Sequence, residues 1–153
     1  MPAKDIYHDT VKRALEKDGW TITHDPFPMQ IGRKRLSADL GAERLINAEK
    51  GTKKIVFEVK SFVGRSDVKD LEQALGQYVL YRHVLNEMQS DRKLYLAISE
   101  EVFNSVFSIE LGEVLFKNQT VKLIVFDKKV RQYFNGYPIE IPRNYQNHTS
   151  RTR

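Results

Sequence analysis

Three side chains that together can hydrolyse a phosphodiester bond lie in the first half of the sequence. They are Asp39, Glu58 and Lys60. Such hydrolysis needs charge stabilised on the phosphoryl oxygens and a water molecule activated, and a metal ion with oxygen ligands does both. Because Mg²⁺ prefers carboxylates, carbonyls and water, we expect Asp39, Glu58 and the backbone carbonyl of Val59 to bind Mg²⁺ or Mn²⁺. Lys60 would orient or deprotonate the attacking water.

Two strands should position these side chains, one over residues 36–48 and one over residues 53–62, joined by a turn at a Lys-Gly pair. Side chains of a strand point alternately to opposite faces of a sheet. In the second strand this places Glu58 and Lys60 together on one face, opposite an apolar face. The first strand carries Asp39. A plainer interpretation stays open, in which the pattern is a solvated strand face with an ordinary cross-strand ion pair.

The remaining elements alternate between helix and strand. Before the two strands we expect a helix over 5–18 capped by Asp5, a strand over 20–23, and an interruption of regular secondary structure at residues 25–28. After them we expect a helix over about 68–89 capped by Ser66 or Asp67, a strand over 92–99, a helical region over 100–117 broken near Ser108, and a strand over 121–127. Alternation in the second half implies parallel strand pairing, and the earlier hairpin implies antiparallel pairing. The prediction is an α/β fold with a mixed sheet.

The bulk composition limits the classes of protein and site. At 153 residues the chain fits one domain, which we place at residues 1–140, followed by a basic, disordered tail at 141–153. The absence of cysteine excludes disulfides, thiolate zinc sites and cysteine nucleophiles. No apolar run is long enough to span a bilayer, and the N-terminus lacks the apolar stretch of a signal peptide. A cytoplasmic location away from membranes fits these features.

The net charge of +5 is concentrated at the C-terminal end. Residues 128–153 hold six basic side chains and one acidic side chain, so 6 − 1 = +5, and residues 1–127 balance at 19 against 19. A basic tail suits nucleic acid. It is equally typical of a solvated terminus without a specific partner.

The order of these motifs resembles a known superfamily. Asp39, then Glu58-Val59-Lys60, then a helix bearing glutamines resembles the PD-(D/E)xK nucleases. More closely, the chain resembles the XisH proteins, the excision controlling factors of the fdxN DNA element, in the stretches HDTVKRALEKDGWTITHDP, SADLGAERLINAEKG, IVFEVKSF and QALGQYVLYR. The resemblance extends to about Tyr137. It implies a restriction-endonuclease-like mixed sheet flanked by helices, a role in programmed excision of a DNA element, and a small companion protein of the XisI type.

The resemblance also implies roles for side chains outside the two strands. A helix glutamine in such nucleases supports the site or the DNA, and we favour Gln77 over Gln73, although both also fit exposed helix positions. Three consecutive basic residues would neutralise DNA phosphates or form a solvated loop, namely Arg33, Lys34 and Arg35. One departure is that Ala38, and not proline, precedes Asp39.

The first helix of these nucleases often carries a further acidic residue, for which the sequence offers three candidates. Asp9 and Glu16 are acidic, and His8 lies near the apolar stripe of the expected helix. A lone histidine in such a place is also typical of a packed, hydrogen-bonded side chain. All three candidates stay open at this point.

Two functions of different classes follow from the resemblance. The first is a Mg²⁺- or Mn²⁺-dependent DNA endonuclease that takes part in excision of a DNA element by DNA recombination. The second is a catalytically silent accessory protein that binds an XisI-like partner, or the recombinase and DNA. Because an enzyme that cuts two strands commonly pairs two subunits, we also expect a homodimer.

Overall fold

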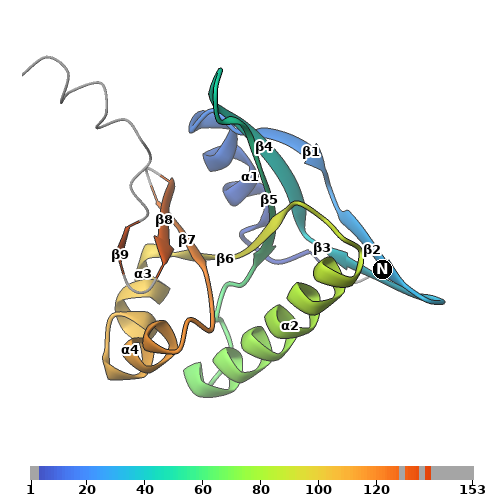
Figure 1. Ribbon diagram of the computed structural model, residues 1–153. Coiled ribbons are helices and arrows are strands. Elements are labelled where there is room, and N and C mark those ends of the chain that lie inside the picture. Colours follow the sequence, from blue (N-terminus) through green and yellow to red (C-terminus); the bar gives the residue numbers. More distant parts are fainter. Residues whose placement is uncertain (1–3, 128–129, 135–136, 139–153) are drawn as a thin grey trace, which may run out of the picture.

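A seven-stranded mixed sheet forms the centre of the computed structural model, which describes residues 4–127, 130–134 and 137–138 (Figure 1). The strands in spatial order are β1 (Thr21–His24), β4 (Leu40–Asn47), β5 (Gly51–Val59), β6 (Lys93–Ser99), β7 (Leu123–Phe126), β8 (Val130–Phe134) and β9 (Tyr137–Pro138). The β5–β6 and β6–β7 pairs are parallel and the others are antiparallel. A separate antiparallel pair consists of β2 (Phe27–Ile31) and β3 (Lys34–Ala38).

Helices cover both faces of this sheet (Figure 1). Helix α1 (His8–Lys17) buries Val11 and Leu15 in a core on one face. The core on the other face includes buried side chains of the remaining helices, which are α2 (Asp67–Glu87), α3 (Glu100–Val102), the π-helix η1 (Phe103–Phe107) and α4 (Glu110–Lys117). The predicted mixed α/β sheet flanked by helices is confirmed.

Strand β5 is buried on both faces, and its alternation decides where Glu58 points. Ile55 and Phe57 belong to the core beneath α1, whereas Val56 belongs to the core beneath α2. Glu58 has the same parity as Val56, so it lies on the α2 face. The predicted division of this strand into an apolar face and a face with Glu58 is confirmed.

The predicted strand over residues 36–48 is wrong as one element, because the chain passes from one sheet to another within it. β3 pairs with β2, and β4 pairs with β1 and β5. Asp39 lies between the two strands, one residue before the Leu40–Phe57 pair. The β2–β3 hairpin was not expected from the sequence. It begins at Phe27, inside the segment that we interpreted as an interruption of regular secondary structure.

The predicted strand over residues 53–62 ends early. β5 ends at Val59, although the Lys60 amide still donates to the carbonyl of Ala97 at 3.0 Å. The next amide, that of Ser61, donates instead to the carboxyl group of Asp5 at 3.0 Å, so the hydrogen bonding of the sheet stops here. Lys60 therefore lies just beyond the strand and not within it.

The ends of the helices agree with the sequence at α2 and differ at α1. Ser66 caps α2, because its hydroxyl oxygen accepts from the Lys69 amide at 3.3 Å. The expected break near Ser108 is also present, between η1 and α4. However, α1 begins at His8, so the prediction of Asp5 as its cap is wrong. The Asp5 carboxylate instead accepts hydrogen bonds from the Tyr7 and Ser61 amides.

The predicted boundary at residue 140 and the basic tail at 141–153 lie outside the described residues. Among the helices of the described part, none is long and apolar enough to cross a membrane.

Candidate active site at the end of strand β5

Backbone hydrogen bonds fix Asp39 and Glu58 next to each other. The Val59 amide donates to Asp39 Oδ2 at 2.7 Å, and the Asp39 amide donates to Glu58 Oε2 at 3.3 Å. Their carboxyl groups also lie within hydrogen-bonding reach of each other. We call these two residues the carboxyl pair. The junction between β3 and β4 thus places Asp39 against the end of β5. The sequence analysis expected Asp39 beside Glu58, although within a strand and not at a junction.

Burial dominates the electrostatics of the carboxyl pair. Glu58 is 5% exposed, and burial, followed by the charge of Asp39, raises its pKa to about 9. Burial also raises the pKa of Asp39, against the opposing effects of the Val59 amide and His8. Ionising both carboxyl groups would place two like charges side by side, so the two groups titrate as a coupled pair and the pKa of Glu58 is the one raised most.

Lys60 supplies a positive charge beside the carboxyl pair. Its Nζ lies 3.8 Å from Glu58 Oε1, and its side chain is 31% exposed. The side chain therefore contacts both the buried carboxyl group and solvent. Asp39, Glu58 and Lys60, which the sequence analysis grouped together, lie together in space.

His8 is the residue of α1 that reaches the carboxyl pair. It is 3% exposed, and its Nδ1 lies 3.9 Å from Asp39 Oδ1. Within the described ranges, this Nδ1 is a buried polar atom without a hydrogen-bond partner. The other two candidates of the first helix, Asp9 and Glu16, are exposed. His8 is thus both packed in the core and adjacent to the candidate site.

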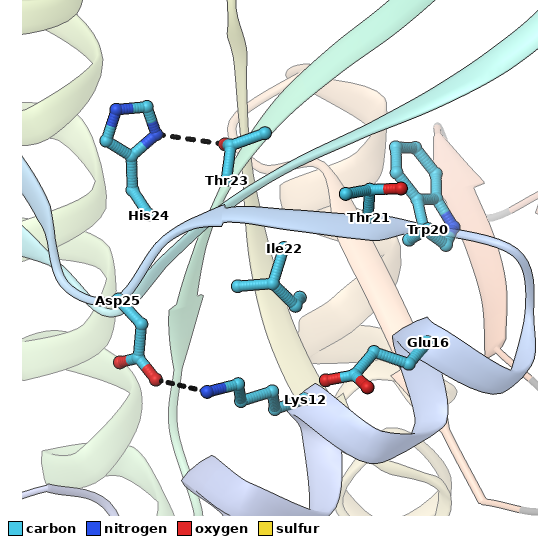
Figure 2. Close-up of a pocket in the computed structure, with 8 residues that line it drawn as sticks. All are labelled: Lys12, Glu16, Trp20, Thr21, Ile22, Thr23, His24 and Asp25. Carbon is cyan, nitrogen blue, oxygen red and sulfur yellow. Dashed lines mark hydrogen bonds and ion pairs between the residues drawn. The ribbon is translucent and has the colours of Figure 1, made fainter.

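Asp25 orients His8 from the opposite side, a role that the sequence did not indicate. Its Oδ1 lies 2.8 Å from His8 Nε2, and its Oδ2 accepts from Lys12 Nζ at 2.9 Å. Burial acts to raise the pKa of Asp25, but the hydrogen bonds from Lys12 and His8 outweigh it and lower that pKa. Figure 2 shows Lys12 reaching from α1 to Asp25 at the rim of a hollow of about 630 Å³ between α1 and β1.

Gln77 reaches the site through Tyr81. Its Nε2 donates to the Tyr81 hydroxyl oxygen at 2.7 Å. Burial raises the pKa of Tyr81, and the charges of Glu58 and Asp39 raise it further, so the phenol lies near the carboxyl pair. Gln73 is exposed. Of the two glutamines, Gln77 is thus the one that contacts Tyr81, and its role in the site stays a prediction.

The three basic residues Arg33, Lys34 and Arg35 are exposed at the tip of the β2–β3 hairpin. Arg35 and Tyr81 both line a hollow of about 820 Å³ between this hairpin and α2. Contact of these basic residues with DNA stays a prediction.

Comparison with known proteins assigns the family. Residues 1–133 match the family model described as XisH protein. The chain belongs to the XisH family. It is 37% identical to an XisH family protein of Nostoc punctiforme PCC 73102, whose crystal structure superposes with a TM-score of 0.73 over 85% of this chain and 99% of that one. A search of curated proteins finds no significant match.

A second crystal structure shares this fold. It is described as an fdxN element excision controlling factor protein from Anabaena variabilis. It is also 37% identical, with a TM-score of 0.73 over 86% of this chain and 99% of that one. The XisH fold is therefore present along almost the whole length of both relatives.

The donor atoms of this XisH site suit a hard divalent cation with few protein ligands. Among the residues that the structure describes, no cluster of three or more His, Asp or Glu side chains is arranged to hold a metal ion. A metal would therefore be held by Asp39 and Glu58, with the Val59 carbonyl and water supplying further oxygens. Mg²⁺ usually keeps several waters and binds through one or two carboxylates, so the residues present fit it.

Proposed function

We propose that this XisH-family chain is a Mg²⁺- or Mn²⁺-dependent DNA endonuclease that acts in the excision of a DNA element. The observation that carries the proposal is the carboxyl pair, in which Glu58 is buried and Asp39 is half-buried, with Lys60 Nζ at 3.8 Å from Glu58 Oε1. Two adjacent carboxyl groups can hold a metal ion for phosphodiester hydrolysis, and a partly exposed lysine beside them can reach the attacking water. The excision role is supported by the relative described as an fdxN element excision controlling factor protein.

Each residue of the proposed site has a distinct role. A bound Mg²⁺ would polarise the phosphoryl group and lower the pKa of a bound water. The carboxyl pair, once ionised, would carry the negative charge that holds the cation. Lys60, which contacts both Glu58 and solvent, would orient the attacking water. Gln77 would hold the Tyr81 hydroxyl beside the pair.

A cleavage assay tests the proposal. Purified protein is incubated with linear and branched DNA and Mg²⁺ or Mn²⁺, with and without the XisI-type companion protein. We expect metal-dependent cleavage that falls about a hundredfold or more in Asp39→Asn, Glu58→Gln and Lys60→Met, in line with the usual contribution of acid–base groups. The exposed residues Asp9 and Glu16 supply the matched controls Asp9→Asn and Glu16→Gln, which should cut normally. If the wild type cuts none of these substrates, the proposal fails.

A second candidate is a silent accessory role, in which the chain binds an XisI-type partner, or the recombinase and DNA. It is favoured by one observation, that each carboxyl group of the pair already accepts a hydrogen bond from a backbone amide of the protein. Such a pair can serve the fold without a metal. In this case Glu58→Gln should still bind the companion protein and support excision in cells. Loss of excision in a folded Glu58→Gln variant would contradict it.

A further inference from the structure

A row of basic side chains crosses four neighbouring strands on the face of the sheet that α1 covers in part. It consists of Arg44 on β4, Lys53 on β5, Lys93 on β6 and Lys122 immediately before β7, and we call it the basic row. Each member has the parity of side chains that are buried in the core beneath α1, such as Ala42, Ile55, Tyr95 and Ile124. All four basic side chains therefore project from the same face.

The strand register brings the members of this row side by side. Arg44 pairs directly with Lys53 across β4 and β5. Lys53 Nζ and Lys122 Nζ lie 5.6 Å and 6.0 Å from the centre of the Tyr95 ring, so the two lysines flank one aromatic side chain. Tyr95 is only 3% exposed. The lysine stems thus cover the tyrosine while their charged ends can reach solvent.

The charges of the basic row act on one another. Burial lowers the pKa of Lys53, and the charges of Lys122 and Arg44 lower it further. Burial likewise lowers the pKa of Lys122, followed by the charge of Lys93. Arg44 has an acidic partner, since its Nη1 lies 2.9 Å from Asp18 Oδ2. Like charges placed together at a cost in stability are typical of a surface that binds an anion.

We propose that the basic row binds the phosphodiester backbone of a nucleic acid. Neighbouring strands are about 4.8 Å apart, so four strands spread the charges over roughly 14 Å. This spread is too wide for one phosphate group and suits successive phosphates of a chain. Lysines act as mobile point charges, so the contact would be independent of base sequence.

This surface is distinct from the carboxyl pair. Lys53 and Glu58 lie five positions apart on β5, which is roughly 17 Å along a strand, and they project from opposite faces. A nucleic acid bound to the basic row therefore does not occupy the candidate active site from the same side. Binding of nucleic acid to the basic row does not depend on whether the chain cuts DNA.

The strand itself provides a matched control. Lys54 follows Lys53 directly, faces the other side of the sheet, and lies 3.6 Å from Asp91. The test variant is Lys53→Met with Lys122→Met, which removes two charges and keeps apolar stems over Tyr95. The control is Lys54→Met with Lys117→Met, which changes the net charge by the same amount. Lys117 is exposed on α4, on the far side of the sheet.

Binding is measured by fluorescence anisotropy of a short labelled DNA duplex at several salt concentrations, with EDTA present so that no metal-dependent cleavage occurs. We expect the test variant to bind about tenfold more weakly. The slope of log affinity against log salt should become shallower by nearly two, because each lost phosphate contact removes about 0.9. The control variant should match the wild type in both quantities.

Unchanged binding in the test variant would overturn the proposal, and so would an equal loss in the control variant. Equal displacement of DNA by an acidic polypeptide such as polyglutamate would overturn it as well. A variant with Lys53→Arg and Lys122→Arg keeps the charges, so it should bind like the wild type even where the methionine variant folds poorly. Loss of binding in this arginine variant would also contradict the proposal. The binding assay contains EDTA, so its result does not depend on metal-dependent cleavage at the carboxyl pair.

Discussion

Glu58 lies almost completely out of solvent beside a second carboxyl group, and both circumstances raise its pKa. The usual pKa of about 4.5 applies to the unfolded chain, and a pKa of about 9 applies to the folded chain. Between these values, unfolding releases a proton. The free energy of unfolding should therefore fall as the pH rises through this window, and it should stop falling on this account above it.

Glu58→Gln should remove this pH dependence. A glutamine has the same shape, can still accept from the Asp39 amide, and can donate to the Asp39 carboxylate. We expect the variant to be at least as stable as the wild type at pH 8 and the difference to shrink toward pH 4, as measured by urea unfolding across the range. Glu16→Gln, at an exposed position, is the control and should follow the wild type. A variant that loses stability with rising pH as steeply as the wild type would refute the assignment.

His8 should contribute to stability through its bond to Asp25. Removal of the ring leaves a buried space and deprives Asp25 of one of two charge-assisted partners. We expect His8→Ala to lower the free energy of unfolding by about 1–3 kcal/mol. Asp9→Ala, at the exposed next position, should change it little. Equal stability of His8→Ala and wild type would mean that the His8–Asp25 contact is not formed in solution.

At this scale the sequence predicted the local part of the site and missed the distant part. Lys60 follows Glu58 by two residues and its amide still donates to the neighbouring strand, so the proximity of the two side chains follows from the two-residue period. Asp25 lies 17 positions from His8, and no periodicity connects them. The placement of Tyr81 beside the carboxyl pair likewise depends on how α2 packs on the sheet. Only the folded chain shows such contacts.

At the scale of elements, Asp5 ties the start of α1 to the end of β5. Its Oδ1 accepts from the Tyr7 amide at 2.9 Å, and its Oδ2 accepts from the Ser61 amide at 3.0 Å. Asp5→Ala should lower the free energy of unfolding by about 1–3 kcal/mol, because two partly buried amides lose their acceptor. Urea unfolding measures this loss, with Lys4→Ala as the exposed control. An unchanged midpoint for Asp5→Ala would show that the tie does not contribute.

The helices and strands were predictable where the residue pattern is compatible with only one element. The long helix α2 has a serine cap and a buried stripe, and its bounds agree with the expectation within about two residues. The alternating pattern of residues 36–48 is the same whether the strand continues or changes sheets. The change at Asp39 depends on Phe27 and Met29, which join the core beneath α2. That packing is non-local, so the sequence did not separate β3 from β4.

At the scale of the whole molecule, the sheet separates two kinds of charge. The carboxyl pair lies on the α2 face at the end of β5, and the basic row lies on the α1 face near the start of β5. Residues 1–127 carry equal numbers of basic and acidic side chains, but the fold places them on different surfaces. The exterior is therefore not uniformly neutral. The DNA that is cut would meet the divalent cation at the carboxyl pair, and the basic row would hold a further stretch of nucleic-acid backbone on the other face.

A divalent cation should stabilise the whole fold. A ligand that binds only the folded state at about a hundredfold excess over its Kd adds about 2.7 kcal/mol to the free energy of unfolding. We expect Mn²⁺ to raise the Tm of the wild type and to leave the Tm of Glu58→Gln and Asp39→Asn unchanged. Glu16→Gln should respond like the wild type. An equal shift in all four proteins would mean that Mn²⁺ binds elsewhere.

The most direct measurement of the central claim is anomalous diffraction from crystals soaked in Mn²⁺. We expect one strong peak in contact with the Asp39 and Glu58 carboxylates, about 2 Å from their oxygens. We expect no such peak in crystals of Glu58→Gln. Well-ordered carboxylates at high Mn²⁺ without a peak between them would contradict the assignment of this pair as a metal site.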